Sequence, residues 1–95
     1  MNWQVVIRPG AEADLHDAKR WYDSRRPGLG DELLDEIGQA IGQLAENPER
    51  RPIYHNGFRR LLTRRFPYKV FYRVENDRVI VFRILHIKRD HQRLL

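Results

Sequence analysis

Arginines in the second half of the chain are the residues best suited to chemistry or binding. Nearly all acidic residues precede position 50, so charge is polarised along the sequence. Guanidinium groups on or beside a sheet can hold phosphates bidentately or pair with the carboxylates of a binding segment. They can alternatively be strand-edge charges that discourage association between sheets. That alternative suits single arginines better than the whole group, because Arg73 and Arg83 interrupt otherwise apolar strands. The basic residues concerned are Arg50, Arg51, Arg59, Arg60, Arg64, Arg65, Arg73, Arg78, Arg83, Lys88 and Arg89.

His86 is the histidine best placed for acid–base catalysis. It ends the last predicted strand beside basic residues, where it could act as a general base or acid while arginines stabilise a phosphorane-like charge. The alternative is a half-buried strand-end histidine bonded to backbone. His16, on a solvated helix face, and His55, in a loop, are not expected to act. His86 and His91 lack a third ligand, so we expect no metal site.

Composition predicts one small basic domain spanning residues 1–95. With 41% hydrophobic residues the chain has one modest core, and we expect no buried cofactor. The 18 Lys and Arg residues outnumber the 13 Asp and Glu residues, and the net charge of +5 favours an acidic partner such as nucleic acid or an acidic protein. The sequence has no cysteine, no apolar stretch of membrane-spanning length and no signal-peptide pattern, which predicts a cytoplasmic protein without a membrane partner.

The first half of the chain predicts a strand followed by a helical hairpin. Residues 4–8 form a short β-branched run that is stopped by Pro9 and Gly10. Between residues 11 and 25 apolar side chains recur every three or four positions, which predicts an amphipathic helix. The Arg-Pro-Gly-Leu-Gly sequence at 26–30 forces a sharp reversal into a second helix over residues 29–46. Because the connection is short, the two helices should be antiparallel.

The second half predicts three strands, since aromatic and β-branched residues are enriched over residues 58–63, 68–75 and 78–87. Asn76 and Asp77 suit a two-residue hairpin turn between the last two. If Glu75 pairs with Arg78, one face carries Tyr68, Val70, Tyr72, Val74, Val79, Val81, Arg83, Leu85 and Ile87, and the other carries Lys69, Phe71, Arg73, Ile80, Phe82, Ile84, His86 and Lys88. A slip of one residue would exchange these sets. The expected fold class is α+β, in the order β-α-α-β-β-β, with the helical hairpin packed on an antiparallel sheet.

Several segments together resemble the ParE/RelE toxin superfamily, in an order that covers nearly the whole chain. They are PGAEADL at 9–15, WY at 21–22, RPGLG at 26–30, NP at 47–48, RRLL at 59–62, FPYKVFYRV at 66–74 and ILH at 84–86. The fold of that family agrees with the element order given above. The resemblance implies the toxin of a bacterial type II toxin–antitoxin pair. A cognate antitoxin would hold it inactive in a hetero-oligomer by wrapping a C-terminal segment around it.

One branch of the superfamily, the RelE-like toxins, cleaves messenger RNA on the ribosome. For that branch the resemblance implies phosphate clamps at Arg65, Arg73 and Arg83 and an acid–base role for His86. The set is incomplete, because no tyrosine follows Tyr72 and the C-terminal residues 92–95 offer no catalytic side chain except an arginine.

ParE-like members instead bind DNA gyrase and stall it, which needs no catalytic set in the toxin. The turn at 26–30, the Phe-Pro-Tyr sequence at 66–68 and the Leu-His pair at 85–86 are more similar to this branch, which we favour. A third alternative is a degenerate toxin retained as a binding module. The residues expected to bind the target or the antitoxin are Arg59, Arg60, Arg65, Arg73, Arg83, His86 and Arg89.

Overall fold

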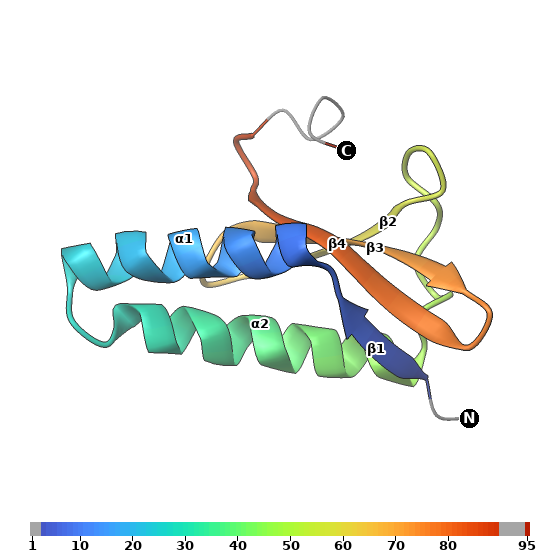
Figure 1. The fold of residues 1–95 in the computed structure, drawn as a ribbon, viewed down its shortest axis with the longest axis horizontal. Coiled ribbons are helices and arrows are strands. Elements are labelled where there is room, and N and C mark those ends of the chain that lie inside the picture. The colour runs from blue at the N-terminus through green and yellow to red at the C-terminus, as the bar shows by residue number, and fades with distance from the viewer. Residues whose placement is uncertain (1–2, 90–94) are drawn as a thin grey trace.

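The computed structural model describes residues 3–89 and residue 95. Its elements follow the predicted order and are β1 (Gln4–Ile7), α1 (Pro9–Arg25), α2 (Leu29–Glu46), β2 (Arg59–Leu62), β3 (Tyr68–Glu75) and β4 (Arg78–His86). The connection between the helices lies at one end of the molecule and the strands lie toward the other end (Figure 1). This arrangement confirms the predicted α+β class. Among the described residues, no helix is both long enough and apolar enough to cross a bilayer.

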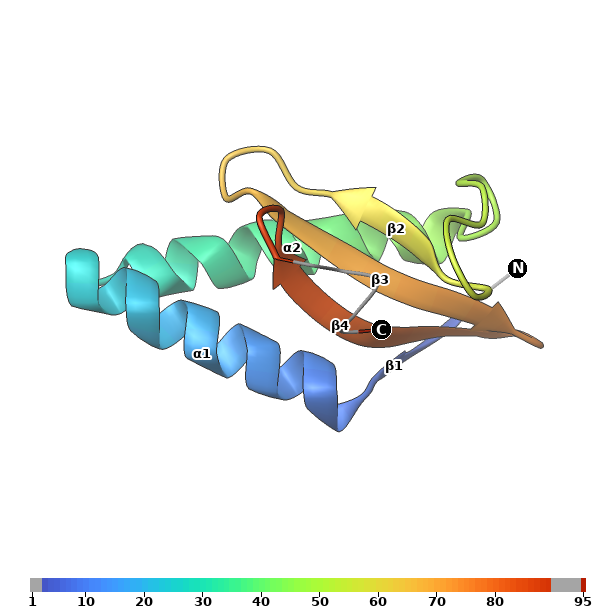
Figure 2. The ribbon, with the colours of Figure 1, turned by 90° about the horizontal axis from the view of Figure 1, so that it is seen from above.

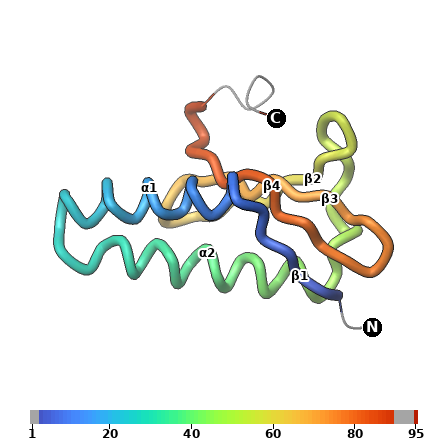
Figure 3. The backbone as a smooth tube through the Cα atoms, viewed as in Figure 1, coloured from blue at the N-terminus to red at the C-terminus, as the bar shows by residue number. Residues whose placement is uncertain are grey.

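The four strands form one mixed sheet, so the prediction of an antiparallel sheet was wrong for one strand. The strand order is β1-β4-β3-β2, with β3 antiparallel to both of its neighbours and β1 parallel to β4. Figure 3 shows β1 in blue beside β4 in orange, although the two strands come from opposite halves of the chain. Parallel neighbours need a long crossover, which the helices and the two other strands supply. Composition identifies strands, but it does not reveal which distant strands pair.

A β-bulge interrupts the hairpin of β3 and β4. Glu75 pairs with Arg78 across the predicted two-residue turn, in which Asn76 adopts the left-handed conformation with φ 57°. The pairing continues as far as Tyr72 with Val81. The next pair is Phe71 with Arg83, which leaves Phe82 as an extra residue on β4.

The bulge exchanges the two faces of β4 relative to the predicted assignment. Ile84 pairs with Val70 and joins the core under the helices, whereas Leu85 packs with Phe71 on the opposite face. The assignment is therefore right as far as Val81 and wrong for these later residues. An extra residue shifts the alternation of side chains by one, and nothing in the strand composition signals it.

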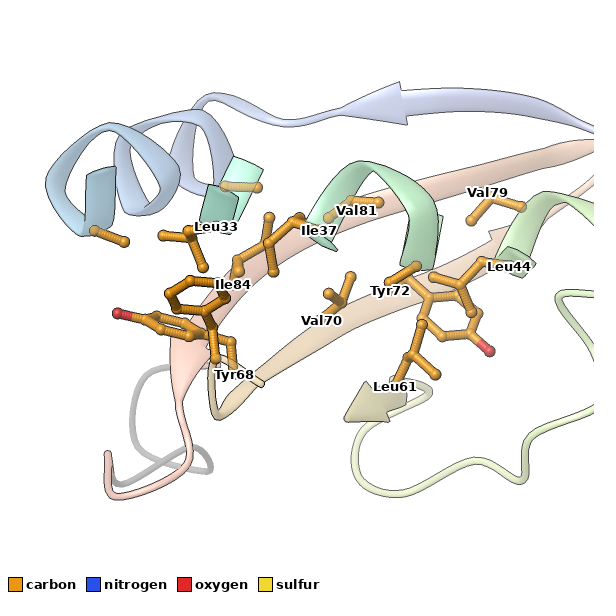
Figure 4. Close-up of a cluster of buried hydrophobic side chains, with 14 residues drawn as sticks. Leu33, Ile37, Leu44, Leu61, Tyr68, Val70, Tyr72, Val79, Val81 and Ile84 are labelled. Carbon is orange, nitrogen blue, oxygen red and sulfur yellow. The ribbon is translucent and has the colours of Figure 1, made fainter. Parts of the chain in front are cut away.

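The main core lies between the sheet and the helical hairpin (Figure 4). Leu33, Ile37 and Leu44 of α2 are at most 2% exposed, and burial of each contributes about 1.5–3 kcal/mol. They pack with side chains of the inner sheet face, which are Val70, Tyr72, Val79, Val81 and Ile84. Seen from above, α1 lies on the side of β1 and β4, and α2 lies on the side of β2 and β3 (Figure 2).

The opposite side of the sheet, here called the outer face, carries a second and smaller apolar cluster. Phe58, Phe71 and Leu85 are buried there, and Tyr54, Phe82 and Leu95 pack partly against them. Aromatic rings therefore cover much of the outer face of the sheet.

Tyr72, on the inner face, anchors the segment between α2 and β2. Its hydroxyl group donates to the carbonyl of Pro48 at 2.9 Å. Burial raises the pKa of that hydroxyl.

The two helices approach closely where their connection ends. Gly28 adopts a φ of 89°, which turns the chain, and the N–H of Gly30 donates to Asp23 Oδ1 at 2.7 Å. The ammonium group of Lys19 lies 2.7 Å from the other carboxylate oxygen, and this hydrogen bond lowers the pKa of Asp23. A Cβ atom on Gly30 would lie 2.6 Å from the Lys19 carbonyl oxygen. The hairpin therefore requires glycine at position 30.

Gly30→Ala should destabilise the protein by about 1–3 kcal/mol, because the added methyl group overlaps backbone that cannot move without separating the helices. Gly38→Ala is the matched control, since a Cβ atom at that exposed position of α2 meets nothing within 4 Å. That control should gain up to about 1 kcal/mol from helix propensity. Urea denaturation followed by circular dichroism measures both, and equal stabilities for the two variants would contradict the proposed crowding.

Candidate functional site

Arg83, one of the predicted binding residues, is held by Asp14 of α1. Its Nε atom lies 2.8 Å from Asp14 Oδ2 and its Nη2 atom lies 2.9 Å from Oδ1, so the pair is bidentate. The backbone N–H of Ile84 donates to the same Oδ2 at 2.8 Å. The hydrogen bonds to the Asp14 carboxylate raise the pKa of Arg83 above its ordinary value. Arg83 therefore joins the sheet to the helix as a permanent cation.

The contact occurs where β4 extends past its neighbour β1. The last bond between the two segments is donated by the Arg8 N–H to the Val81 carbonyl at 2.9 Å, and α1 begins directly afterwards. Beyond that point the edge of β4 faces the first turns of α1. Gly10 permits the close approach, because a Cβ atom there would lie 3.2 Å from Arg83 Cδ. Asp14 then accepts from the Ile84 N–H, which no strand reaches on this side.

His86 and Arg89 lie together at the end of β4. They line a surface hollow of about 180 Å³ with Asp14, Asp17, Ala18, Trp21, Tyr68 and Ile84. The His86 ring meets the Tyr68 ring edge-on at 5.4 Å, and its Nδ1 accepts from the Lys88 N–H at 3.2 Å. Burial raises the pKa of Tyr68 to about 12, which keeps this phenol protonated even in mildly alkaline solution. The geometry is that of a half-buried histidine bonded to backbone at the end of a strand.

Arg65 and Arg59 contact α2 and the segment that follows it. Arg65 Nη2 lies 2.7 Å from Glu32 Oε1, and this hydrogen bond lowers the pKa of Glu32. The Arg59 guanidinium donates to the Glu49 carbonyl at 3.0 Å and also to the Arg51 carbonyl. Both arginines thus have local partners near α2.

Three guanidinium groups lie across the outer face, on the rings of its apolar layer. Arg73 lies 4.3 Å from the centre of the Phe58 ring, Arg60 lies 3.7 Å from that of Tyr54, and Arg8 lies 5.6 Å from that of Phe82. At these distances each cation is attracted to the face of the ring. We call Arg8, Arg60 and Arg73 the outer-face arginine row.

The predicted site residues are therefore distributed over three places. Arg83, His86 and Arg89 gather at the end of β4, Arg59 and Arg65 contact the α2 side, and the outer face carries Arg60 and Arg73. Arg65, Arg73 and Arg83 have different neighbours, so the described contacts do not join them and His86 into one catalytic constellation.

Sequence analysis missed two residues that the structure makes prominent, Arg8 and Asp14. Arg8 reaches the outer face through the parallel pairing of β1, and Asp14 acts through a contact with Arg83 across 69 positions of the chain. Neither relation has a local sequence signal. Within residues 3–89 and 95 no three His, Asp or Glu side chains are grouped as metal ligands. His91, which was paired with His86 in the prediction on metals, lies outside the described residues.

The fold is shared with chains from solved toxin–antitoxin complexes. The "Chromosomal ParDE TA system from P. aeruginosa" matches with a TM-score of 0.82 and 21% identity, over 90% of this chain and 97% of that chain. The intact E. coli RelBE toxin–antitoxin complex matches with a TM-score of 0.70 and 13% identity, over 92% and 99% of the chains. RelBE2 from Mycobacterium tuberculosis matches with a TM-score of 0.60 and 23% identity, over 90% and 99%. The fold defines the class of small α+β proteins that includes these toxins.

A family match is more specific than the fold. The family described as "ParE toxin of type II toxin-antitoxin system, parDE" matches residues 5–91, a range that includes almost all of β1 and every later element. This protein belongs to the ParE toxin family of type II toxin–antitoxin systems. The resemblance identified in the sequence is thereby confirmed. No curated protein sequence matches the chain.

Asp14→Ala should destabilise the protein by about 3 kcal/mol, because it leaves a half-buried guanidinium and the Ile84 N–H without their acceptor. Asp14→Asn should lose less, since an amide oxygen can still accept from that N–H. In a double-mutant cycle with Arg83→Ala, urea denaturation should give a coupling free energy above about 1 kcal/mol. Additive losses within about 0.3 kcal/mol would show that the pair does not act as a unit.

Proposed function

We propose that this protein is a ParE-like toxin that acts in the bacterial cytoplasm by binding DNA gyrase and stalling it, and that a cognate antitoxin neutralises it. The observation that carries the proposal is the family match over residues 5–91. The fold shared with the ParDE system of P. aeruginosa supports it. A toxin that acts by binding a target needs exposed surface rather than an enclosed active site, and the outer-face arginine row is such a surface.

The ribonuclease alternative receives less support from the geometry. Its candidate phosphate clamps would have to face one reacting phosphate, yet Arg83 is engaged by Asp14 and Arg65 by Glu32. Arg73 lies against Phe58 on the outer face. A general base also needs the reacting group within hydrogen-bond reach, together with the clamps. The proposed gyrase inhibition requires no such convergence.

The antitoxin has a suitable surface beside β2. This edge strand pairs with β3 on one side, and its other side borders a groove of about 360 Å³ toward α2. Leu62 is 56% exposed there. An extended antitoxin segment could pair with the strand and place apolar side chains in the groove, with main-chain hydrogen bonds adding affinity. Residues lining the groove are Glu36, Gln39, Ala40, Gln43, Leu61, Leu62, Thr63 and Arg64.

Gyrase inhibition can be measured directly. Purified toxin in stoichiometric excess should abolish supercoiling by purified gyrase and should trap cleaved DNA, and prior addition of the antitoxin encoded beside the toxin gene should restore supercoiling. Messenger RNA should stay intact during growth arrest caused by the toxin. Unchanged supercoiling at excess toxin, or codon-phased cuts in ribosome-bound messages, would refute the proposal.

Leu62→Asp should weaken antitoxin binding at least tenfold, because it replaces an exposed apolar side chain of the groove with a charge, and each tenfold loss corresponds to about 1.4 kcal/mol. Ile53→Asp is the matched control, since Ile53 is 60% exposed outside that groove. Calorimetric titration of each variant with the co-expressed antitoxin measures the affinities. Equal affinities for the two variants would place the antitoxin elsewhere.

A further inference from the structure

Among the described residues, several cations near the helices form ion pairs with carboxylates, whereas the outer-face arginine row forms none. The cations Lys19, Arg26, Arg65 and Arg83 all form ion pairs with carboxylates of α1 or α2. The outer-face arginine row forms no ion pair with a described residue. Three positive charges therefore share one face without a neutralising partner of their own.

The contacts of the outer-face arginine row hold the guanidinium groups in place but do not use all of their hydrogen-bond donors. Arg73 Nη2 donates to the Asn56 carbonyl at 2.5 Å, and its Nε atom is buried without a hydrogen-bond partner among the described residues, so Nε cannot itself reach a bound phosphate. The side chains of Arg8 and Arg60 are exposed and lie against the rings of Phe82 and Tyr54. The exposed guanidinium groups of Arg8 and Arg60 can donate from their N–H edges, which match phosphate oxygens bidentately.

The position of the rings decides which polyanion fits. Phe58 is 5% exposed, and the guanidinium group of Arg73 lies over it. Single-stranded nucleic acid is usually held by bases stacked on open aromatic rings, whereas the half-buried rings of Tyr54 and Phe82 have Arg60 and Arg8 over them. Contacts to backbone phosphates need only the arginine edges. The surface is thus suited to a duplex, whose bases stay stacked inside.

The reach of the row also fits a duplex backbone. The three arginines come from the end of β1, from β3 and from β2, and so extend over the whole width of the sheet. Four strands about 4.8 Å apart give a width of about 14 Å. One strand of a duplex presents about four phosphates along that length of its axis. A row of three cations can therefore contact neighbouring phosphates of one strand.

We infer that the outer-face arginine row binds the phosphate backbone of duplex DNA. The inference rests on the proposed gyrase-directed function and adds a second contact to it, in which the toxin grips the DNA that gyrase holds as well as the enzyme. Binding depends on phosphates and is independent of base sequence. The binding should therefore be detectable with duplex DNA in the absence of gyrase.

The test is fluorescence anisotropy of the full-length toxin with a labelled 20-base-pair duplex between 50 and 200 mM salt. Three phosphate contacts should give a slope of log K against log salt near about −2.7, which is a loss of about 40-fold over that range. Arg60→Gln and Arg8→Gln should each make the slope shallower by about 0.9. Arg20→Gln removes the same charge from the exposed side of α1 and should leave the slope unchanged.

Arg73→Gln is a second-line variant, because Arg73 also contacts Asn56 and Phe58, and its thermal unfolding has to match the parent before its binding is compared. Absence of duplex binding at 50 mM salt would overturn the inference. An equal loss of duplex affinity in Arg20→Gln would also overturn the inference, since binding would then depend on net charge and not on the outer-face arginine row. Tighter binding of a 20-nucleotide RNA, with duplex affinity unaffected by Arg60→Gln, would assign the face to RNA.

Gyrase assays on the same variants separate this inference from the proposed function. DNA binding that depends on the row, without any inhibition of gyrase, would sustain the inference and refute the proposed function. Inhibition that persists in Arg8→Gln and Arg60→Gln, with no duplex binding by the parent, would refute the inference alone.

Discussion

The fold depends on how the edge of β4 is completed after β1 ends. A strand with open N–H groups needs acceptors, and burial without them costs about 1–3 kcal/mol for each group. Asp14 provides the acceptor for Ile84 and simultaneously fixes Arg83. One carboxylate therefore ties α1 to the sheet at two points, close to Gly10, where a Cβ atom would lie 3.2 Å from Arg83 Cδ. The hollow beside His86 and the shape of the inner core follow from that placement.

The bulge at Phe82 belongs to the same arrangement. It lies directly after the last residue of β4 that pairs with β1, where the strand meets α1 instead. The extra residue directs Arg83 toward Asp14 and lets Phe82 meet Phe58 on the outer face at 5.2 Å. A single irregularity in the ladder thus serves both the helix contact and the ring layer under the arginines. Bulges often re-aim side chains in this way.

Much of this fold could be predicted from the sequence, because its elements are defined locally. Apolar spacing and the break around Gly28 predicted a second helix over about residues 29–46, and α2 spans Leu29–Glu46. The hairpin turn at Asn76 was also predicted. What could not be predicted were relations over long distances, including the parallel pairing of β1, the bulge at Phe82 and the partner of Arg83. The grouping of the arginines depends on those relations. Composition therefore showed only that the second half of the chain is basic, whereas the structure shows that its arginines lie in three separate places.

The central place of β4 has a consequence for when the chain can complete its fold during synthesis. The strand pairs with both β1 and β3, yet it is synthesised after every other element. While a nascent chain lacks it, β1 has no partner and the helices lack much of the sheet on which they pack. Contacts between distant segments also form slowly. A chain still emerging from the ribosome therefore cannot complete its sheet or its core until β4 has been made, late in translation.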